Sequence, residues 1–260
     1  MKQLALAFLL LAAPAQARVL KVCADPNNLP FSNAKEEGFE NRIVRIVAEE
    51  LHAEVHWVWY AQRRGNVRET LNAGQCDVIP GVASSLEMLA TTRPYYRSTY
   101  VAVVRDGPLG DLSRFDDARL QGLRIGVQLI GDDGSNTPPA HALTMRGMVD
   151  NVRGYTVYGD YDSPSPQSPI VDAVARGDVD VAFVWGPTAG YFAAREPVKL
   201  KLTPVPTSDG TALPMVYDVS MGVRREDLAL RRELDAALRR RAAEIRAVLA
   251  KFAVPLVADR

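Results

Sequence analysis

The sequence contains little cysteine or histidine, and neither charge is in excess. Two cysteines and three histidines occur among 260 residues, and two cysteines alone do not make a metal site. Lysine plus arginine number 31, as do aspartate plus glutamate, so the formal net charge is zero. Nucleic-acid-binding proteins usually carry a clear basic excess, so this class is disfavoured. With 47% hydrophobic and 24% charged residues, the composition is that of a globular protein.

Long hydrophobic runs are also missing. The longest apolar run covers residues 4–13, whereas a hydrocarbon core requires roughly 20 residues. Lys2 precedes this run, and Ala15-Gln16-Ala17 forms a small-x-small cleavage site before Arg18. These are the parts of a secretory signal peptide. We therefore expect a signal peptide over residues 1–17 and a mature protein that is soluble, located in the periplasm and not membrane-spanning.

The usual motifs of catalytic and metal sites are absent. No glycine-rich phosphate loop or nucleophile elbow occurs. His52 and His56 are four residues apart, but no third ligand has zinc-protein spacing, so ordinary histidines are favoured. The polar segment 132–137 lacks the alternating acids and closing glutamate of a calcium loop. A turn with a helix cap is favoured there, with a calcium or lanthanide ion as the alternative. We expect no metal, no cofactor and no catalytic residue.

Hydrophobic periodicity predicts an α/β protein. Strand-like and helix-like segments alternate over residues 19–80 and again over residues 124–206. Such alternation is typical of open, mostly parallel sheets flanked by helices. Two extended runs, 99–105 and 216–223, separate the two series, and one long amphipathic helix is expected over residues 226–252.

The order of these segments predicts two lobes and a hinge. The chain would cross between the lobes at residues 99–105 and return at residues 216–223. Lobe 1 would then contain residues 18–98 plus 224–260, and lobe 2 would contain residues 106–215. Paired crossovers of this kind form a hinge, with a cleft between the lobes.

The loops that follow the expected strands should line this cleft, because ligands of open α/β sheets bind outside the carboxyl ends of the strands. Aromatic residues at several of these positions suit an apolar guest or a partner loop, and ordinary interlobe core is the alternative. The expected cleft or partner-binding residues are Asp25, Asn27, Asn28, Phe31, Phe39, Ser84, Asp132, Thr137, Trp185 and Tyr191.

Cys23 and Cys76 fall on strands that could be neighbours. Export would permit a disulfide. However, Cys23 lies late in its expected strand and Cys76 lies at the start of its own, an offset that could exceed the Cα reach of a disulfide. A disulfide and two buried thiols both stay open.

The layout resembles the periplasmic solute-binding fold of the small class that binds amino acids. Leu29-Pro30-Phe31 with Gly38-Phe39 resembles the first cleft loop of that class, and Pro94-Tyr95-Tyr96 resembles the segment before its first crossover. Ile125-Gly126-Val127-Gln128 resembles the first strand of its second lobe. The resemblance covers the whole mature chain and implies a two-lobed fold.

The charged groups with which that class grips an amino acid are missing. The class uses an arginine for the ligand carboxylate and an acid for its ammonium group. Met88 and Trp185 occupy the corresponding places here. Loss of one partner of a buried ion pair costs about 3–5 kcal/mol. We therefore expect no tight binding of a zwitterionic amino acid.

A second group of motifs is more specific. It comprises the segment from Cys23 to Ser32, Gly38-Phe39-Glu40-Asn41, the segment from Thr92 to Tyr100, Ile125 to Thr137 with Pro138-Pro139-Ala140-His141, Trp185 to Ala193, and Ser220-Met221-Gly222-Val223-Arg224. These motifs are similar to those of the quinoprotein-dehydrogenase-associated substrate-binding proteins. This family contains the periplasmic MxaJ and XoxJ proteins, which are encoded with calcium-type and lanthanide-type methanol dehydrogenases. The short opening Asn27-Asn28-Leu29-Pro30-Phe31 favours the XoxJ branch.

The resemblance implies a non-enzymatic accessory protein. Its expected partner is a periplasmic quinoprotein methanol dehydrogenase that depends on pyrroloquinoline quinone (PQQ), with the cytochrome c of that system as a second candidate. It would help the dehydrogenase to mature or become active. The first alternative is a solute-binding receptor of an ABC transporter for a non-amino-acid solute. The second alternative is a cleft enzyme such as a dehydratase, which would require converging carboxylates.

Overall fold

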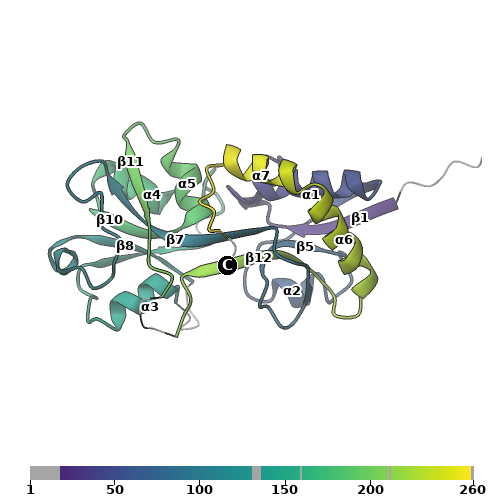
Figure 1. The fold of residues 1–260 in the computed structure, drawn as a ribbon, viewed down its shortest axis with the longest axis horizontal. Helices are drawn as coiled ribbons and strands as arrows, with labels where there is room; N and C mark the ends of the chain where they lie inside the picture. The colour runs from purple at the N-terminus through teal and green to yellow at the C-terminus, as the bar shows by residue number, and fades with distance from the viewer. Residues whose placement is uncertain (1–17, 131–135, 159, 209, 211, 259–260) are drawn as a thin grey trace, which may run out of the picture.

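The computed structural model describes residues 18–130, 136–158, 160–208, 210 and 212–258. The expected signal peptide and Asp132 lie outside these residues. Figure 1 shows two groups of helices and strands joined by two long strands, β7 and β12. We call the group that contains β1 the first lobe and the group that contains β8 the second lobe. No helix in the described part of the chain has the length and hydrophobicity that a membrane span requires.

The first lobe is built on parallel strands that helices connect. Strands β1 and β4 pair in parallel from Arg18↔Ala53 to Ala24↔Trp59, with α1 as the crossover between them. The apolar residues of α1 recur at helical spacing and are buried in the lobe core. The elements of this lobe are β1 (Arg18–Ala24), β2 (Asn27–Asn28), β3 (Ser32–Asn33), α1 (Phe39–Glu50), β4 (Ala53–Trp59), α2 (Asn66–Glu69), β5 (Ile79–Ala83), β6 (Ala90–Thr91), α6 (Leu228–Arg240) and α7 (Ala242–Lys251).

The second lobe repeats this architecture. Strand β8 pairs in parallel with β9 on one side and with β10 on the other. The core strand β10 is apolar along its length, as expected for a strand covered on both faces. The elements are η1 (Ala118–Gly122), β8 (Ile125–Leu129), α3 (Pro138–Thr144), β9 (Val152–Thr156), α4 (Pro169–Arg176), β10 (Val181–Trp185), α5 (Gly186–Ala193) and β11 (Leu200–Pro204).

The two long strands pass between the lobes side by side. Strands β7 (Tyr96–Arg105) and β12 (Val216–Val223) are antiparallel and pair from Val216↔Thr99 to Val219↔Tyr96. They join a mixed sheet of order β5-β12-β7-β10-β8-β9 that runs through both lobes (Figure 1). The C-terminal segment runs beside β7, where the Val257 amide donates to the Arg97 carbonyl oxygen.

The prediction of one long C-terminal helix is wrong in one respect, because the helix breaks at Arg241 into α6 and α7. The guanidinium group of Arg241 bonds to Glu244 and also to Glu49 and Glu50 at the end of α1. The break allows the apolar faces of both helices to enter the same core as α1, with Leu234 from α6 among the buried residues.

The sequence pattern of residues 140–149 predicts one helix, but the helix ends before Val149. Helix α3 stops at Thr144, and Gly147 then adopts a left-handed conformation with φ of +72°. The Met148 amide donates to the Leu143 carbonyl oxygen, which closes the helix end. A glycine three residues beyond the last helical residue explains the shorter helix.

Cys23 and Cys76 form a disulfide with Cα atoms 5.6 Å apart. Val22 bridges to Val78 in parallel, so Cys76 precedes the paired segment and is not constrained by strand register. Arg224 Nη1 donates to the Cys76 carbonyl oxygen at 2.7 Å and holds this turn in place. The turn before β5 therefore brings Cys76 close to Cys23, although the expected strand positions suggested that they are too far apart.

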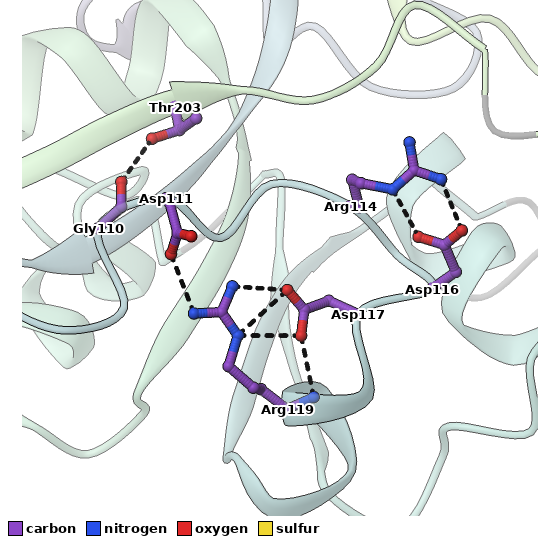
Figure 2. A network of polar contacts seen from close by, with 7 residues as sticks. All are labelled: Gly110, Asp111, Arg114, Asp116, Asp117, Arg119 and Thr203. Atoms are coloured by element: carbon purple, nitrogen blue, oxygen red, sulfur yellow. Dashed lines mark hydrogen bonds and ion pairs between the residues drawn. The ribbon is translucent and has the colours of Figure 1, made fainter.

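A polar network holds the connection between β7 and β8 on the surface of the second lobe (Figure 2). Arg119 bridges Asp117 and Asp111, and the Asp117 side chain also accepts the Arg119 backbone amide at the start of η1. Thr203 Oγ1 donates to the Gly110 carbonyl oxygen and ties this connection to β11. The Arg119 guanidinium lowers the pKa of Asp117 to about 2. None of these residues lines the cavity described next.

Candidate functional site

A cavity of about 390 Å³ lies between the two lobes. Its volume is within the range of small-molecule sites, about 300–1,000 Å³. The lining residues come from both lobes and from β7 and β12. They are Asp25, Asn28, Phe31, Glu40, Gln62, Gly81, Ala83, Tyr96, Tyr100, Gln128, Ile130, Thr137, Val157, Tyr158, Tyr161, Gln167, Trp185, Thr188, Tyr217 and Val219.

Asp25 lies just beyond β1, at the carboxyl end of the first-lobe sheet, and is only 1% exposed. Its carboxylate accepts the backbone amides of Asn27 at 2.8 Å and Gln62 at 2.7 Å. The hydroxyl of Tyr161 is a third donor. Three donors compensate the desolvation of this buried carboxylate.

The loop between Asp25 and α1 is held by its own polar groups. Ser32 Oγ donates to the Asp25 carbonyl oxygen at 2.8 Å, and Asn41 Oδ1 accepts the amides of Asn33 and Gly38 at 3.1 Å each. A Cβ atom at Gly38 would lie 2.0 Å from the Phe31 carbonyl oxygen, so glycine is required there. This loop places Phe31 against the cavity.

Glu40 supplies the second carboxyl group of the cavity and is only 2% exposed. No described residue donates a hydrogen bond to its side chain or forms an ion pair with it. Gly81, with φ of +73°, leaves the space that its carboxyl occupies, because a Cβ there would lie 2.0 Å from Oε1. Burial, and then the nearby charge of Asp25, raise the pKa of Glu40 to about 8. Glu40 is therefore mostly protonated at neutral pH.

An aromatic cluster lines the cavity on the side of the crossover strands and the second lobe. The Trp185 ring contacts the Tyr100 ring at 5.3 Å and the Tyr217 ring at 5.9 Å, both edge to face. The Trp185 backbone amide donates to Gln128 Oε1 at 2.8 Å, and Thr137 Oγ1 donates to the Gln128 carbonyl oxygen at 2.6 Å. The ends of β8 and β10 therefore fix the position of this cluster.

A set of interlobe contacts, which we call the latch, closes one side of the cavity. Besides the bond between Asp25 and Tyr161, Asn27 Nδ2 donates to the carbonyl oxygens of Tyr161 and Ser163 at 3.0 and 2.9 Å. The Arg63 guanidinium packs over the Tyr161 ring at 4.5 Å. Asp25, Asn27 and Arg63 belong to the first lobe, and Tyr161 and Ser163 belong to the second.

Tyr161→Phe should weaken the latch. Asp25 would lose one of its three donors, and a hydrogen bond to a charged group contributes about 1.5–3 kcal/mol. We expect unfolding at lower denaturant and a larger radius of gyration in small-angle X-ray scattering, since the lobes separate. Tyr155→Phe is the matched control, because the buried Tyr155 hydroxyl has no partner. A Tyr161→Phe variant indistinguishable from this control would show that the latch does not hold the lobes together.

The structure brings half of the expected cleft residues to the cavity. Those that line it are Asp25, Asn28, Phe31, Thr137 and Trp185. Asn27 lies in the latch. Ser84 bonds to Ser220 instead, Phe39 is fully buried in the first-lobe core, and Tyr191 stacks on Phe252. Asp132 lies outside the described residues, and a binding role for any of these side chains stays a prediction.

Several lining residues were not anticipated. Glu40 falls within a quoted motif, but an acid in the first turn of a helix is usually solvated, so its spacing carried no indication of burial. Tyr161 lies in a Pro/Ser-rich loop without periodicity. Tyr100 and Tyr217 lie in the predicted crossover runs. The alternation of side chains along a strand could have indicated which residues of these runs share a face.

The charge of the cavity is one-sided. Two carboxyl groups and no lysine or arginine occur among its described lining residues. Met88 is 55% exposed and lies outside the lining, whereas Trp185 lines it. Over the described parts of the chain, no group of three or more His, Cys, Asp or Glu side chains is placed to hold a metal ion.

Comparison with known proteins shows the family of this chain. The model of the bacterial extracellular solute-binding proteins, family 3, matches residues 20–253. Protein MoxJ of Methylorubrum extorquens is 32% identical over 259 residues, which cover 95% of this chain and 84% of that protein.

Two solved structures share the fold over nearly the whole chain. The periplasmic binding protein XoxJ from Methylobacterium extorquens AM1 is 38% identical with a TM-score of 0.76, covering 92% of this chain and 100% of that chain. MxaJ from Methlophaga aminisulfidivorans MPT is 26% identical, with the same TM-score and coverage. The chain therefore belongs to family 3 of the bacterial extracellular solute-binding proteins and, within it, to the family of MoxJ, MxaJ and XoxJ.

Proposed function

We propose that this protein is a periplasmic accessory protein of methanol oxidation. It binds a PQQ-dependent methanol dehydrogenase of the lanthanide type and helps that enzyme to mature or become active, without catalysing a reaction itself. The observation that carries the proposal is the 38% identity to XoxJ over the full length of that chain. The lower identity to MxaJ, 26%, supports the lanthanide-type system over the calcium type.

The composition of the cavity supports this role over amino-acid uptake. A zwitterionic amino acid needs a cation for its carboxylate, and no lysine or arginine is present among the described lining residues. The ligand carboxylate would instead face the Asp25 carboxylate. Like charges in a desolvated site disfavour binding by several kcal/mol.

The proposal predicts a direct complex with the dehydrogenase. When purified protein is mixed with purified dehydrogenase, native mass spectrometry should detect the complex, and dye-coupled methanol oxidation should become faster. A periplasmic binding protein specific for an amino acid serves as the control and should do neither. Neither a complex nor a change in rate, with dehydrogenase reconstituted with calcium or with a lanthanide, would refute the proposal.

A solute receptor of an ABC transporter is the second candidate, favoured by the cavity between the lobes. It requires a ligand-dependent approach of the two lobes and binding to a transporter. Ligand binding stabilises a protein in proportion to the logarithm of ligand concentration over Kd, so thermal shifts with a solute panel test for a ligand.

We also propose that the lobes move about β7 and β12. Residues 18–98 with 224–260 form one lobe, residues 106–215 the other, and residues 99–105 and 216–223 the hinge. The separate hydrophobic cores support this division, since one cluster contains α1, α6 and α7 and another contains β8, β10 and α3. The contacts of the latch would then hold the two lobes together when they form and allow the lobes to separate when they break.

A further inference from the structure

One of the two carboxyl groups of the interlobe cavity is not matched by a donor among the described residues. The Glu40 carboxyl is buried at the cavity and receives no hydrogen bond from a described residue. The Asn28 Oδ1 atom is also without a partner, but it has almost no accessible surface and so does not face the cavity. A carboxyl group that lines a cavity and lacks a donor favours a ligand that carries N–H donors.

The charges of the cavity select the sign of that ligand. Its described ionisable lining side chains are two carboxyl groups and tyrosines. The Asp25 carboxylate already accepts three hydrogen bonds, whereas Glu40 accepts none. A cation beside Glu40 would compensate the charge that this carboxyl acquires when it ionises, and an anion would be repelled by the Asp25 carboxylate.

The aromatic cluster selects the rest of the ligand. Trp185, Tyr100 and Tyr217 present ring surfaces to the same cavity. Aromatic faces attract cations and accommodate apolar groups. A bare ammonium ion would leave most of the 390 Å³ unfilled, so the ligand must also have an apolar body.

We propose that the interlobe cavity binds a small organic ammonium ion that has an apolar body and no carboxylate. The ammonium group lies beside the Glu40 carboxyl, and the apolar body lies against the ring of Trp185. This assignment concerns the cavity alone and holds whether or not the protein binds a dehydrogenase.

The pH dependence of binding follows from the groups around Glu40. These are Asp25, beyond β1, and Tyr95 and Tyr96, at the start of β7, which interact electrostatically with Glu40. The two tyrosines stay neutral because burial holds the pKa of each well above 10. Glu40 must therefore lose its own proton to pair with the ammonium ion, and affinity should rise with pH while the ligand stays protonated.

Three matched probes test the assignment by isothermal titration calorimetry and thermal shift on the purified protein. Phenethylammonium has the ammonium group and an apolar body, phenylalanine adds a carboxylate, and phenethyl alcohol lacks the charge. We expect phenethylammonium to bind at least tenfold more tightly than either of the others. Its affinity should increase by about tenfold between about pH 6.5 and 8.5.

Glu40→Gln should abolish this pH dependence and weaken phenethylammonium binding about tenfold or more. Glu54→Gln is the matched control, since Glu54 is exposed on β4 and outside the cavity. The assignment is overturned if phenethylammonium does not bind at about 10 mM, if the alcohol or phenylalanine binds as tightly, or if affinity does not change with pH in the unaltered protein.

Discussion

Replacing both Cys23 and Cys76 with alanine is expected to lower the free energy of unfolding by about 4 kcal/mol. The disulfide joins positions separated by 53 residues, and a crosslink of this length strongly restricts the unfolded chain. It ties the turn before β5 to β1 in the first lobe. Equilibrium denaturation with guanidinium chloride measures the change.

Reduced wild-type protein is the control for this variant. Both cysteines are almost completely buried, so truncating them also removes packing. If the crosslink is responsible, wild-type protein denatured in the presence of a thiol reductant should match the double variant. A double variant that stays within about 1 kcal/mol of the oxidised protein would show that the disulfide contributes little.

Glu40→Gln is expected to make the protein more stable at pH 8 by a few kcal/mol, with little effect at about pH 4. Burial raises the pKa of Glu40 from 4.5 to about 8, so the folded protein keeps this proton where the unfolded chain loses it. Between these values, the folded state binds more protons than the unfolded state. Each pH unit then removes about 1.4 kcal/mol from the free energy of unfolding.

The sign of this effect distinguishes Glu40 from the carboxylates in ion pairs. Glu40 does not lower the free energy of unfolding below about pH 4.5. Its destabilising effect grows as the pH rises and reaches its full size above about pH 8. Glutamine cannot ionise, so its variant should show a correspondingly flatter pH profile. Denaturation of wild type, Glu40→Gln and the exposed control Glu54→Gln from about pH 4 to 9 measures it. Parallel profiles for all three proteins would contradict the buried position of Glu40.

Hydrophobic periodicity predicted the main elements well because it depends on neighbours along the chain. The expected strand at residues 216–223 coincides with β12. The sequence pattern of residues 170–176 predicts a helix, and this helix differs from α4 by one residue. The C-terminal helix was predicted as one piece because its apolar spacing continues through Arg241. Only the packing of α6 and α7 against α1 required a break there.

The candidate site was harder to predict, since its members are ordinary residue types. Phe39 and Tyr191 were expected at the cleft because they lie in segments assigned to a cleft loop or to the end of a strand, but Phe39 packs against Phe252 and Tyr96 in the core. Aromatic residues serve a core and a cavity equally well, and only their burial distinguishes these roles.

By itself, the sequence determined the α/β architecture and the family. The architecture follows from the local spacing of apolar residues, and the family follows from the order of the motifs. The tertiary structure decided the chemistry of the cavity. Asp25 and Tyr161, which are 136 residues apart, meet only when the two lobes approach each other. Glu40 becomes an unusual acid only when Gly81 and the surrounding elements exclude water from it. Desolvation is a property of the assembled fold, and no pattern of neighbouring residues encodes it.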